Sequence, residues 1–136
     1  MAISFSNALG VHEAALGLRT KRAEVLASNL TNVDTPNYKA RDIDFKSALK
    51  SQLAMTGNAA SMKATNSKHF GVAQGQGVTA LDLKYRVPLQ PSLDGNTVDE
   101  QSEMSRFAKN TMDFQASFQF LNGKFKGLSK AIKGEI

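Results

Sequence analysis

Few of the 136 residues in this chain are of a type that performs catalytic or metal chemistry. The chain has no cysteine, and neither of its two histidines, His12 and His69, has companions at the spacing of metal ligands. Asp42 and Asp44 could act as paired carboxylates, but the apolar residues that alternate with them indicate the polar face of a strand instead. The sequence therefore predicts no catalytic residue, no metal site and no cofactor.

The net charge of +5 is concentrated in one part of the chain, because residues 37–68 alone sum to +4. Binding to nucleic acid is one interpretation of an isoelectric point of 9.6. However, the basic residues are spread along this segment with few aromatic residues between them. A solvated basic face, or a surface that matches an acidic partner, is therefore favoured over a nucleic-acid site.

No stretch of the sequence predicts membrane insertion or a cleaved leader. No run approaches the roughly 18 apolar residues of a membrane helix. The N-terminus lacks the basic residues and unbroken apolar stretch of a signal peptide. We expect a protein that is cytosolic, or that is exported by a route that recognises another feature.

Two long helices are predicted, at residues 6–32 and 98–133. In the first, apolar residues recur at helical spacing and form a broad stripe. One row seven residues apart consists of Leu9, Leu16, Ala23 and Leu30, and the row beside it consists of Val11, Leu18 and Val25. Thr97 and Glu100 are spaced as a capping box at the start of the second helix. That helix carries a stripe at the spacing of a coiled coil, called the aromatic stripe below: Met104, Phe107, Thr111, Phe114, Phe118, Leu121, Phe125, Leu128 and Ile132.

The middle of the chain has a different character. Residues 56–79 show no period and are rich in small and polar residues, which is typical of a disordered or loosely extended segment. The stretch that follows alternates as a strand would, with Leu81, Leu83, Tyr85 and Val87 on one face. Asp94-Gly95-Asn96 predicts a turn. The expected fold is mainly α in one structural unit, with terminal regions 1–36 and 98–136 paired as a coiled coil around an extended or β-containing segment 37–97.

The aromatic stripe has two interpretations. It is either the core of a helical hairpin within one chain or an interface on which several copies pack. Its length is about 40 Å at 1.5 Å per residue, and the segment between the helices is unsuited to bracing them. Both interpretations therefore stay open, and they are compatible with each other.

The string LASNLTNVDTPNYKARDIDF, residues 26–45, resembles the N-terminal signature of flagellar basal-body rod proteins within the flagellar axial family. The positions that match its pattern are Asn29, Asn32, Thr35, Pro36, Tyr38, Lys39 and Ala40. Asn37 stands where glycine is frequent, and asparagine is the usual substitute where the backbone is left-handed. The resemblance covers most of the chain except residues 50–78. The pieces at 41–45 and 94–99 favour the proximal rod subunit over its paralogues.

The resemblance implies a structural subunit of the proximal rod, with no enzymatic activity, that polymerises through its terminal helices into a tube around the export channel. It implies contacts with further copies, with the FliE adaptor and with rod proteins such as FlgC, and passage through the flagellar type III export apparatus without a cleaved signal. The turn after the first helix would be an assembly joint: Asn29, Leu30, Asn32, Asp34, Thr35, Pro36, Tyr38 and Lys39. A basic helical nucleic-acid-binding protein and a cytosolic coiled-coil adaptor are the alternatives.

Overall fold

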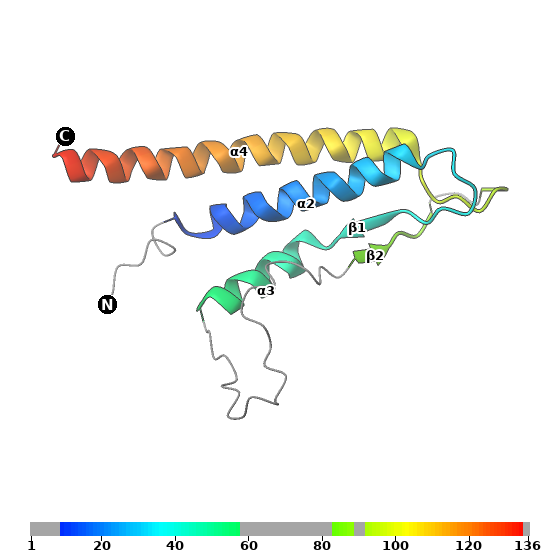
Figure 1. The fold of residues 1–136 in the computed structure, drawn as a ribbon, viewed down its shortest axis with the longest axis horizontal. Coiled ribbons are helices and arrows are strands. Elements are labelled where there is room, and N and C mark those ends of the chain that lie inside the picture. The colour runs from blue at the N-terminus through cyan, green and yellow to red at the C-terminus, as the bar shows by residue number, and fades with distance from the viewer. Residues whose placement is uncertain (1–8, 58–82, 89–91, 135–136) are drawn as a thin grey trace, which may run out of the picture.

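The computed structural model describes residues 9–57, 83–88 and 92–134, and the protein is mainly helical along them, as predicted. Its elements are the helix α2 (Val11–Thr31), the strand β1 (Arg41–Ile43), the helix α3 (Phe45–Gly57), the strand β2 (Leu83–Tyr85) and the helix α4 (Glu100–Lys133) (Figure 1). The period-free stretch 58–79 lies outside the described residues, as does His69.

The two long helices lie side by side and antiparallel (Figure 1). Three contacts set their register: the His12 and Phe120 rings are 5.4 Å apart, Arg19 pairs with Asp113 at 2.8 Å, and Asn29 bonds to Glu103 at 3.0 Å. With 34 residues against 21, α4 is the longer helix by about 20 Å at 1.5 Å per residue. Its C-terminal part therefore extends past the start of α2 (Figure 1).

A two-stranded sheet joins segments that are far apart in the sequence. β1 and β2 pair antiparallel, with Arg41 opposite Tyr85 and Ile43 opposite Leu83. The alternating pattern predicted a strand at this place, and β2 confirms it. In Figure 1 the two strands lie below α2, so that α2 lies between most of the sheet and α4.

The helix α3 was not expected, because residues 37–97 were predicted to be extended or β-containing. Ile43 and Phe45 were both assigned to one alternating strand, but the strand ends at Ile43 and the helix begins at Phe45. The Asp44 carboxylate accepts from the Ser47 amide at 3.2 Å, and its carbonyl accepts from the Ala48 amide at 2.9 Å. An aspartate with these bonds caps the first turn of a helix. The cap, rather than the alternation, decides the structure here.

The start of α4 also differs from the prediction. Its N-cap is Asp99, whose carboxylate accepts from the Ser102 amide at 3.3 Å. Thr97 does not cap the helix, since its hydroxyl accepts instead from the backbone amide of Ala40 at 2.8 Å. The expected capping box of Thr97 and Glu100 was therefore wrong, because the threonine is bonded to the segment beside it.

The core is small, and much of it is polar. The buried apolar residues are Leu9, Ala15, Leu18, Leu26, Ala40 and Ile43. The buried residues of α4 are all polar, namely Glu103, Asn110 and Ser117, which lie seven apart along the helix. The helix pair is therefore held along a polar row on the α4 side, and apolar packing alone does not account for it.

Candidate assembly surfaces

Asn29 occupies the centre of the junction between α2, the sheet and α4. Its side chain is fully buried, and its amide nitrogen donates to the Arg41 carbonyl at 2.7 Å and to the Glu103 carboxylate at 3.0 Å. Its amide oxygen accepts from the Arg41 backbone amide at 3.2 Å and from the Tyr38 hydroxyl at 3.3 Å. The side chain thus pairs with both backbone groups of Arg41 as a neighbouring strand would. An apolar residue here would remove one hydrogen-bond partner from each of these groups.

A chain of alternating charges runs from Asn29 through the junction. The Glu103 carboxylate, 2% exposed, pairs with Arg86, which also reaches the Asp42 carboxylate at 2.6 Å. Asp42 accepts in turn from both Nε and Nη2 of Arg22, at 2.9 and 2.8 Å, a bidentate geometry. These charges connect α2, β1, the residue directly after β2, and α4. We call Arg22, Asn29, Asp42, Arg86 and Glu103 the junction network.

The electrostatics of the junction network favour its charged form. Burial raises the pKa of the Asp42 carboxyl, but hydrogen bonds from Arg22 and Arg86 outweigh burial and leave that pKa below its ordinary value. The hydrogen bond to Asp42 raises the pKa of the Arg22 guanidinium, whereas burial lowers the pKa of Arg86. Arginine stays protonated at neutral pH in spite of such a decrease. The network is therefore a set of ion pairs that depends on Asp42 being ionised.

The turn after α2 is held against the segment that precedes α4. The side-chain amide nitrogen of Asn96 lies 3.1, 2.5 and 3.1 Å from the backbone carbonyls of Asn32, Val33 and Thr35 and donates to them. These bonds satisfy carbonyls at and just after the end of α2. The Asn37 amide donates to the Asp94 carbonyl at 2.9 Å. Two separate loops are thereby joined into one projecting end of the molecule, residues 33–37 and 92–95, called the tip below (Figure 1).

The backbone of the tip needs two left-handed residues. Asn37 has a φ of 62°, which confirms the expectation for an asparagine at the position where the family frequently has glycine. Gly95 has a φ of 70°, and a Cβ there would lie 2.7 Å from the Asn37 side-chain oxygen. Gly95 is therefore required both by its conformation and by its neighbour.

The residues of the expected assembly joint divide into two groups. Asn29, buried, and Asn32 and Tyr38, half-buried, make hydrogen bonds within the chain; Leu30 is half-buried in α2. The others are exposed on or beside the tip: Asp34, Thr35, Pro36 and Lys39. The structure thus brings the motif together as a supported turn with an open surface.

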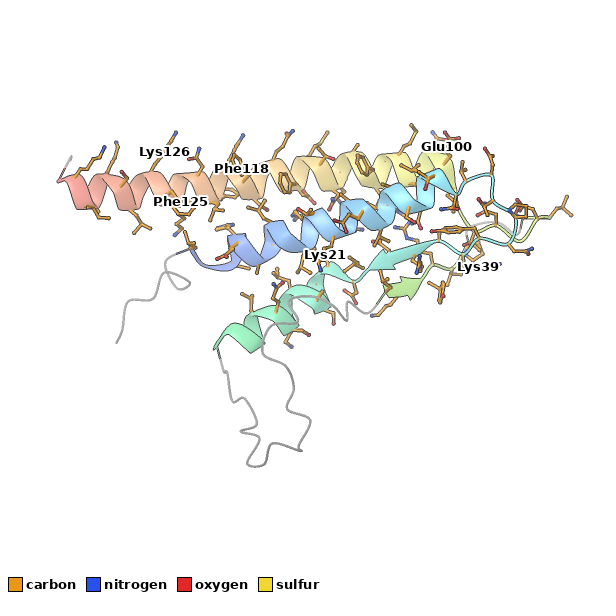
Figure 2. The ribbon with its side chains drawn as sticks, in the orientation of Figure 1. Lys21, Lys39, Glu100, Phe118, Phe125 and Lys126 are labelled. Carbon is orange, nitrogen blue, oxygen red and sulfur yellow. The ribbon has the colours of Figure 1, made fainter. Side chains whose placement is uncertain are left out.

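The aromatic stripe lies beside, and not in, the contact between the long helices. Phe114, Leu121 and Leu128 are half-buried, while Phe107 is 37% exposed. Still more exposed are Met104 at 58%, Phe118 at 55%, Phe125 at 43% and Ile132 at 85%. Phe118 and Phe125 lie along the part of α4 that approaches and passes the start of α2 (Figure 2). Within one chain, the stripe is therefore not the core of the helix pair, and its interpretation as an interface between copies stays a prediction.

The matching row on α2 is only partly covered. Leu9 is buried, whereas Leu16, Ala23 and Leu30 are half-buried. Leu18 and Leu26, at 1% and 0% exposed, supply the main apolar burial of α2 instead. The sequence pattern identified the helix correctly, and Leu18 belongs to the flanking row of its predicted stripe, whereas Leu26 lies outside both rows.

Sequence reasoning missed the members of the junction network other than Asn29. Asp42 was interpreted as the polar face of a strand, and Arg22, Arg86 and Glu103 were not predicted to belong to any site. The signal available was the seven-residue spacing of Glu103, Asn110 and Ser117 beside the aromatic stripe. A polar row of this kind does not by itself show which helix it faces, because its hydrogen-bond acceptors lie far away in the sequence. Asn110, for example, donates to the Arg19 carbonyl at 2.9 Å.

Within the ranges that the structure describes, no group of three or more histidine, aspartate or glutamate residues could hold a metal ion. No helix among those residues is both long and apolar enough to span a membrane. His12 contacts the Phe120 ring.

Comparison with known proteins gives a consistent result. Residues 9–39 match the family described as flagella basal body rod protein. The chain is 49% identical to the flagellar basal body rod protein FlgB of Aeromonas hydrophila, with 99% of each chain covered. It is 45% identical to FlgB of Salmonella typhimurium, over 93% of this chain and 94% of that one. It is 44% identical to FlgB of Escherichia coli K12, with 93% of each covered.

Proposed function

Because this chain belongs to the FlgB family of flagellar basal body rod proteins, we propose that its tip and its aromatic stripe are the surfaces through which it assembles. The chain is a structural subunit of the basal body rod. In our proposal, subunits polymerise through their terminal helices into a tube that transmits torque and surrounds the export channel. The exposed residues of the expected joint, Asp34, Thr35, Pro36 and Lys39, contact neighbouring subunits.

The observation that carries the proposal is the exposed aromatic stripe. Large apolar side chains that lie together on the surface of a protein mark interaction sites. The exposed side chains of the aromatic stripe follow α4 over most of its length. The buried residues of α4 form a polar row, and the more exposed residues of the stripe, Met104, Phe118 and Ile132, offer a surface to other molecules. In a rod, each subunit is surrounded by others, so every copy of the stripe has a neighbouring subunit to contact.

The partners and the route to the rod belong to the same proposal. We expect contacts with further copies of this chain, with the FliE adaptor and with other rod proteins such as FlgC. We also expect export through the flagellar type III apparatus with no cleaved signal, to a rod located in the periplasm. The small, largely polar core supports this route, because little apolar burial opposes unfolding before export.

Nucleic-acid binding by residues 37–68 is not favoured. Among the described basic residues of that segment, Lys39 donates to the Gly95 carbonyl and thereby helps to hold the tip. Relatives that match nearly the whole chain are rod proteins. A cytosolic coiled-coil adaptor is disfavoured for the same reason.

The direct test is fractionation of flagellated cells. We expect the protein to copurify with detergent-extracted basal bodies and to remain after the filament has been removed by acid. A flagellum-deficient strain that lacks the basal-body membrane ring is the control, because the protein should then disappear from the particulate fraction. Recovery only as a free soluble oligomer in the flagellated strain would contradict the proposal.

A further inference from the structure

β2 and the residues that follow it have an unusual distribution of polarity. Lys84 pairs with Asp44 at 3.0 Å, and Arg86 pairs with Asp42 and Glu103. The alternate side chains are apolar and point to solvent, since Leu83 is 40% exposed, Tyr85 71% and Val87 90%. A strand on a soluble protein ordinarily turns its apolar side chains to the protein and its polar ones to water. Lys84 is 62% exposed, but at Arg86 this order is reversed, since the Arg86 side chain is 14% exposed while Tyr85 and Val87 on either side of it are open to solvent. Exposed apolar side chains that lie together indicate a partner outside the chain.

A positive charge borders this apolar face. Arg41 is the cross-strand neighbour of Tyr85, and side chains of directly opposite residues lie on the same face of a sheet. The Arg41 guanidinium forms no ion pair with any of the described residues. We call Arg41, Leu83, Tyr85 and Val87 the sheet outer face, which is covered at its Leu83 end, where the opposite residue Ile43 is 3% exposed. A fitting partner is apolar and carries a carboxylate at its edge.

The first turns of α4 present this chemistry. Glu100, Met104 and Phe107 lie on one side of the helix, at spacings of four and three residues. Glu100 is exposed, Met104 is 58% exposed and Phe107 is 37% exposed, whereas Glu103 between them is buried against Arg86. Glu100 lies at the end of α4 beside the tip (Figure 2). The chain thus carries both an apolar face bordered by a cation and an apolar helix face bordered by a carboxylate.

We propose that the sheet outer face binds the first turns of the long C-terminal helix of a neighbouring rod subunit. That helix has an acidic residue followed by apolar residues four and seven positions later, as Glu100, Met104 and Phe107 are arranged here. Tyr85 and Val87 pack on the apolar residues, and Arg41 pairs with the carboxylate. Because two different surfaces meet, the contact is heterologous and repeats along a polymer. The inference rests on the proposed rod function.

Photocrosslinking in assembled basal bodies tests the contact. A photoreactive phenylalanine analogue in place of Tyr85 is irradiated in purified basal bodies, and the adducts are mapped by mass spectrometry. We expect adducts to a peptide from the first turns of a rod subunit's C-terminal helix, which in this chain is residues 98–108. Adducts that map only to other segments, or no adduct from incorporated protein, would overturn the inference while the rod function stands. Absence of the unsubstituted protein from basal bodies would overturn the rod function itself.

A substitution gives an independent measurement. Val87→Asp places a carboxylate on the sheet outer face. The substitution removes the apolar contact of Val87 with the partner, and the new carboxylate repels the partner's carboxylate. We expect incorporation into basal bodies to fall by about tenfold, the ratio that a modest loss of contact energy produces. Circular dichroism of the purified protein should not change, because Val87 is 90% exposed. Leu53→Asp, an apolar-to-acidic change at a 40% exposed position of α3, is the matched control and should incorporate normally. Normal incorporation of Val87→Asp would also overturn the inference.

Discussion

The two ends of the helix pair are stabilised in different ways. At the tip end, a buried amide and a chain of ion pairs connect α2, β1, the residue after β2 and α4, and each charged group of the junction network has a partner within the chain. At the other end, α4 extends past the start of α2 (Figure 1), and Phe118 and Ile132 are 55% and 85% exposed. The first region is held by contacts within one subunit, and we propose that neighbouring subunits complete the second.

This difference indicates a division of roles. Buried polar groups fix one geometry, because displacing any of them leaves another unsatisfied. The tip is therefore presented in a defined shape before any neighbour is bound. Apolar contacts are less directional, so the stripe can supply binding energy once the tip sets the position. Substitutions at the two ends should consequently fail in different assays.

The largest effect is expected for Phe118→Asp in the aromatic stripe. Loss of a buried phenylalanine costs about 3–5 kcal/mol, and the cost recurs in each copy of a polymer. Phe118 is 55% exposed in the single chain, so the purified protein should fold as the unsubstituted one does. We expect motility and basal-body yield to be lost while the circular dichroism spectrum is unchanged.

The control for that change is Lys109→Asp on the same helix. Lys109 is exposed and lies outside the stripe, and reversing one exposed charge costs less than about 1 kcal/mol. Motility should be largely retained. If cells with Phe118→Asp swim normally, the stripe is not an assembly surface. If the purified variant is unfolded, the stripe belongs to the core of the chain and the contrast between the two ends is wrong.

The next largest effect is expected at the junction network. Glu103→Ala removes one of the two acceptors of the Asn29 side-chain amide and one partner of Arg86 at a site that is 2% exposed. Breaking a buried ion pair in this way costs about 3–5 kcal/mol. The free energy of unfolding in urea should fall by that amount, and amide exchange in residues 33–37 should accelerate. Glu100→Ala, an exposed position one turn earlier, should change neither measurement. A stable Glu103→Ala protein with a protected tip would show that the network does not hold the tip.

The sequence predicted the long helices, the strand at 83–85 and the left-handed Asn37, because each follows from a local pattern. Periodicity, alternation and the conformational preference of asparagine act over a few residues. It failed at Thr97, whose partner Ala40 is 57 positions away. A local capping rule contains no information about such a contact.

The side of α4 that meets α2 could not be predicted for a related reason. Heptad spacing identifies an apolar side of a helix, but it does not say whether the partner is in the same chain. The chain places Glu103 and Asn110 toward α2 because Asn29 and the Arg19 carbonyl are there to bond them. The motif residues of the assembly joint were found because a family signature marks them. The charges that support them were not found, because ion pairs between residues far apart in the sequence follow no fixed spacing.

The smallest of these effects concerns pH and isolates one carboxylate of the junction network. The pKa of Asp42 in the folded chain is below its ordinary value, because the hydrogen bonds from Arg22 and Arg86 outweigh burial. A lowered folded-state pKa contributes stability that is complete above the unfolded-state pKa of about 3.9 and is lost as the pH falls through the folded-state value. Asp42→Asn keeps the shape but removes the charge, and we expect a loss of about 1–3 kcal/mol at pH 7. The exposed carboxyls of Asp44, Asp94 and Asp99 also have lowered pKa values, so the comparison must be between the variant and the unsubstituted protein. In urea titrations the difference in unfolding free energy should be full at pH 7 and should shrink at pH 3. A difference that is equal at both pH values would mean that the Asp42 charge contributes nothing, and that hydrogen-bond geometry alone holds the sheet to the helices.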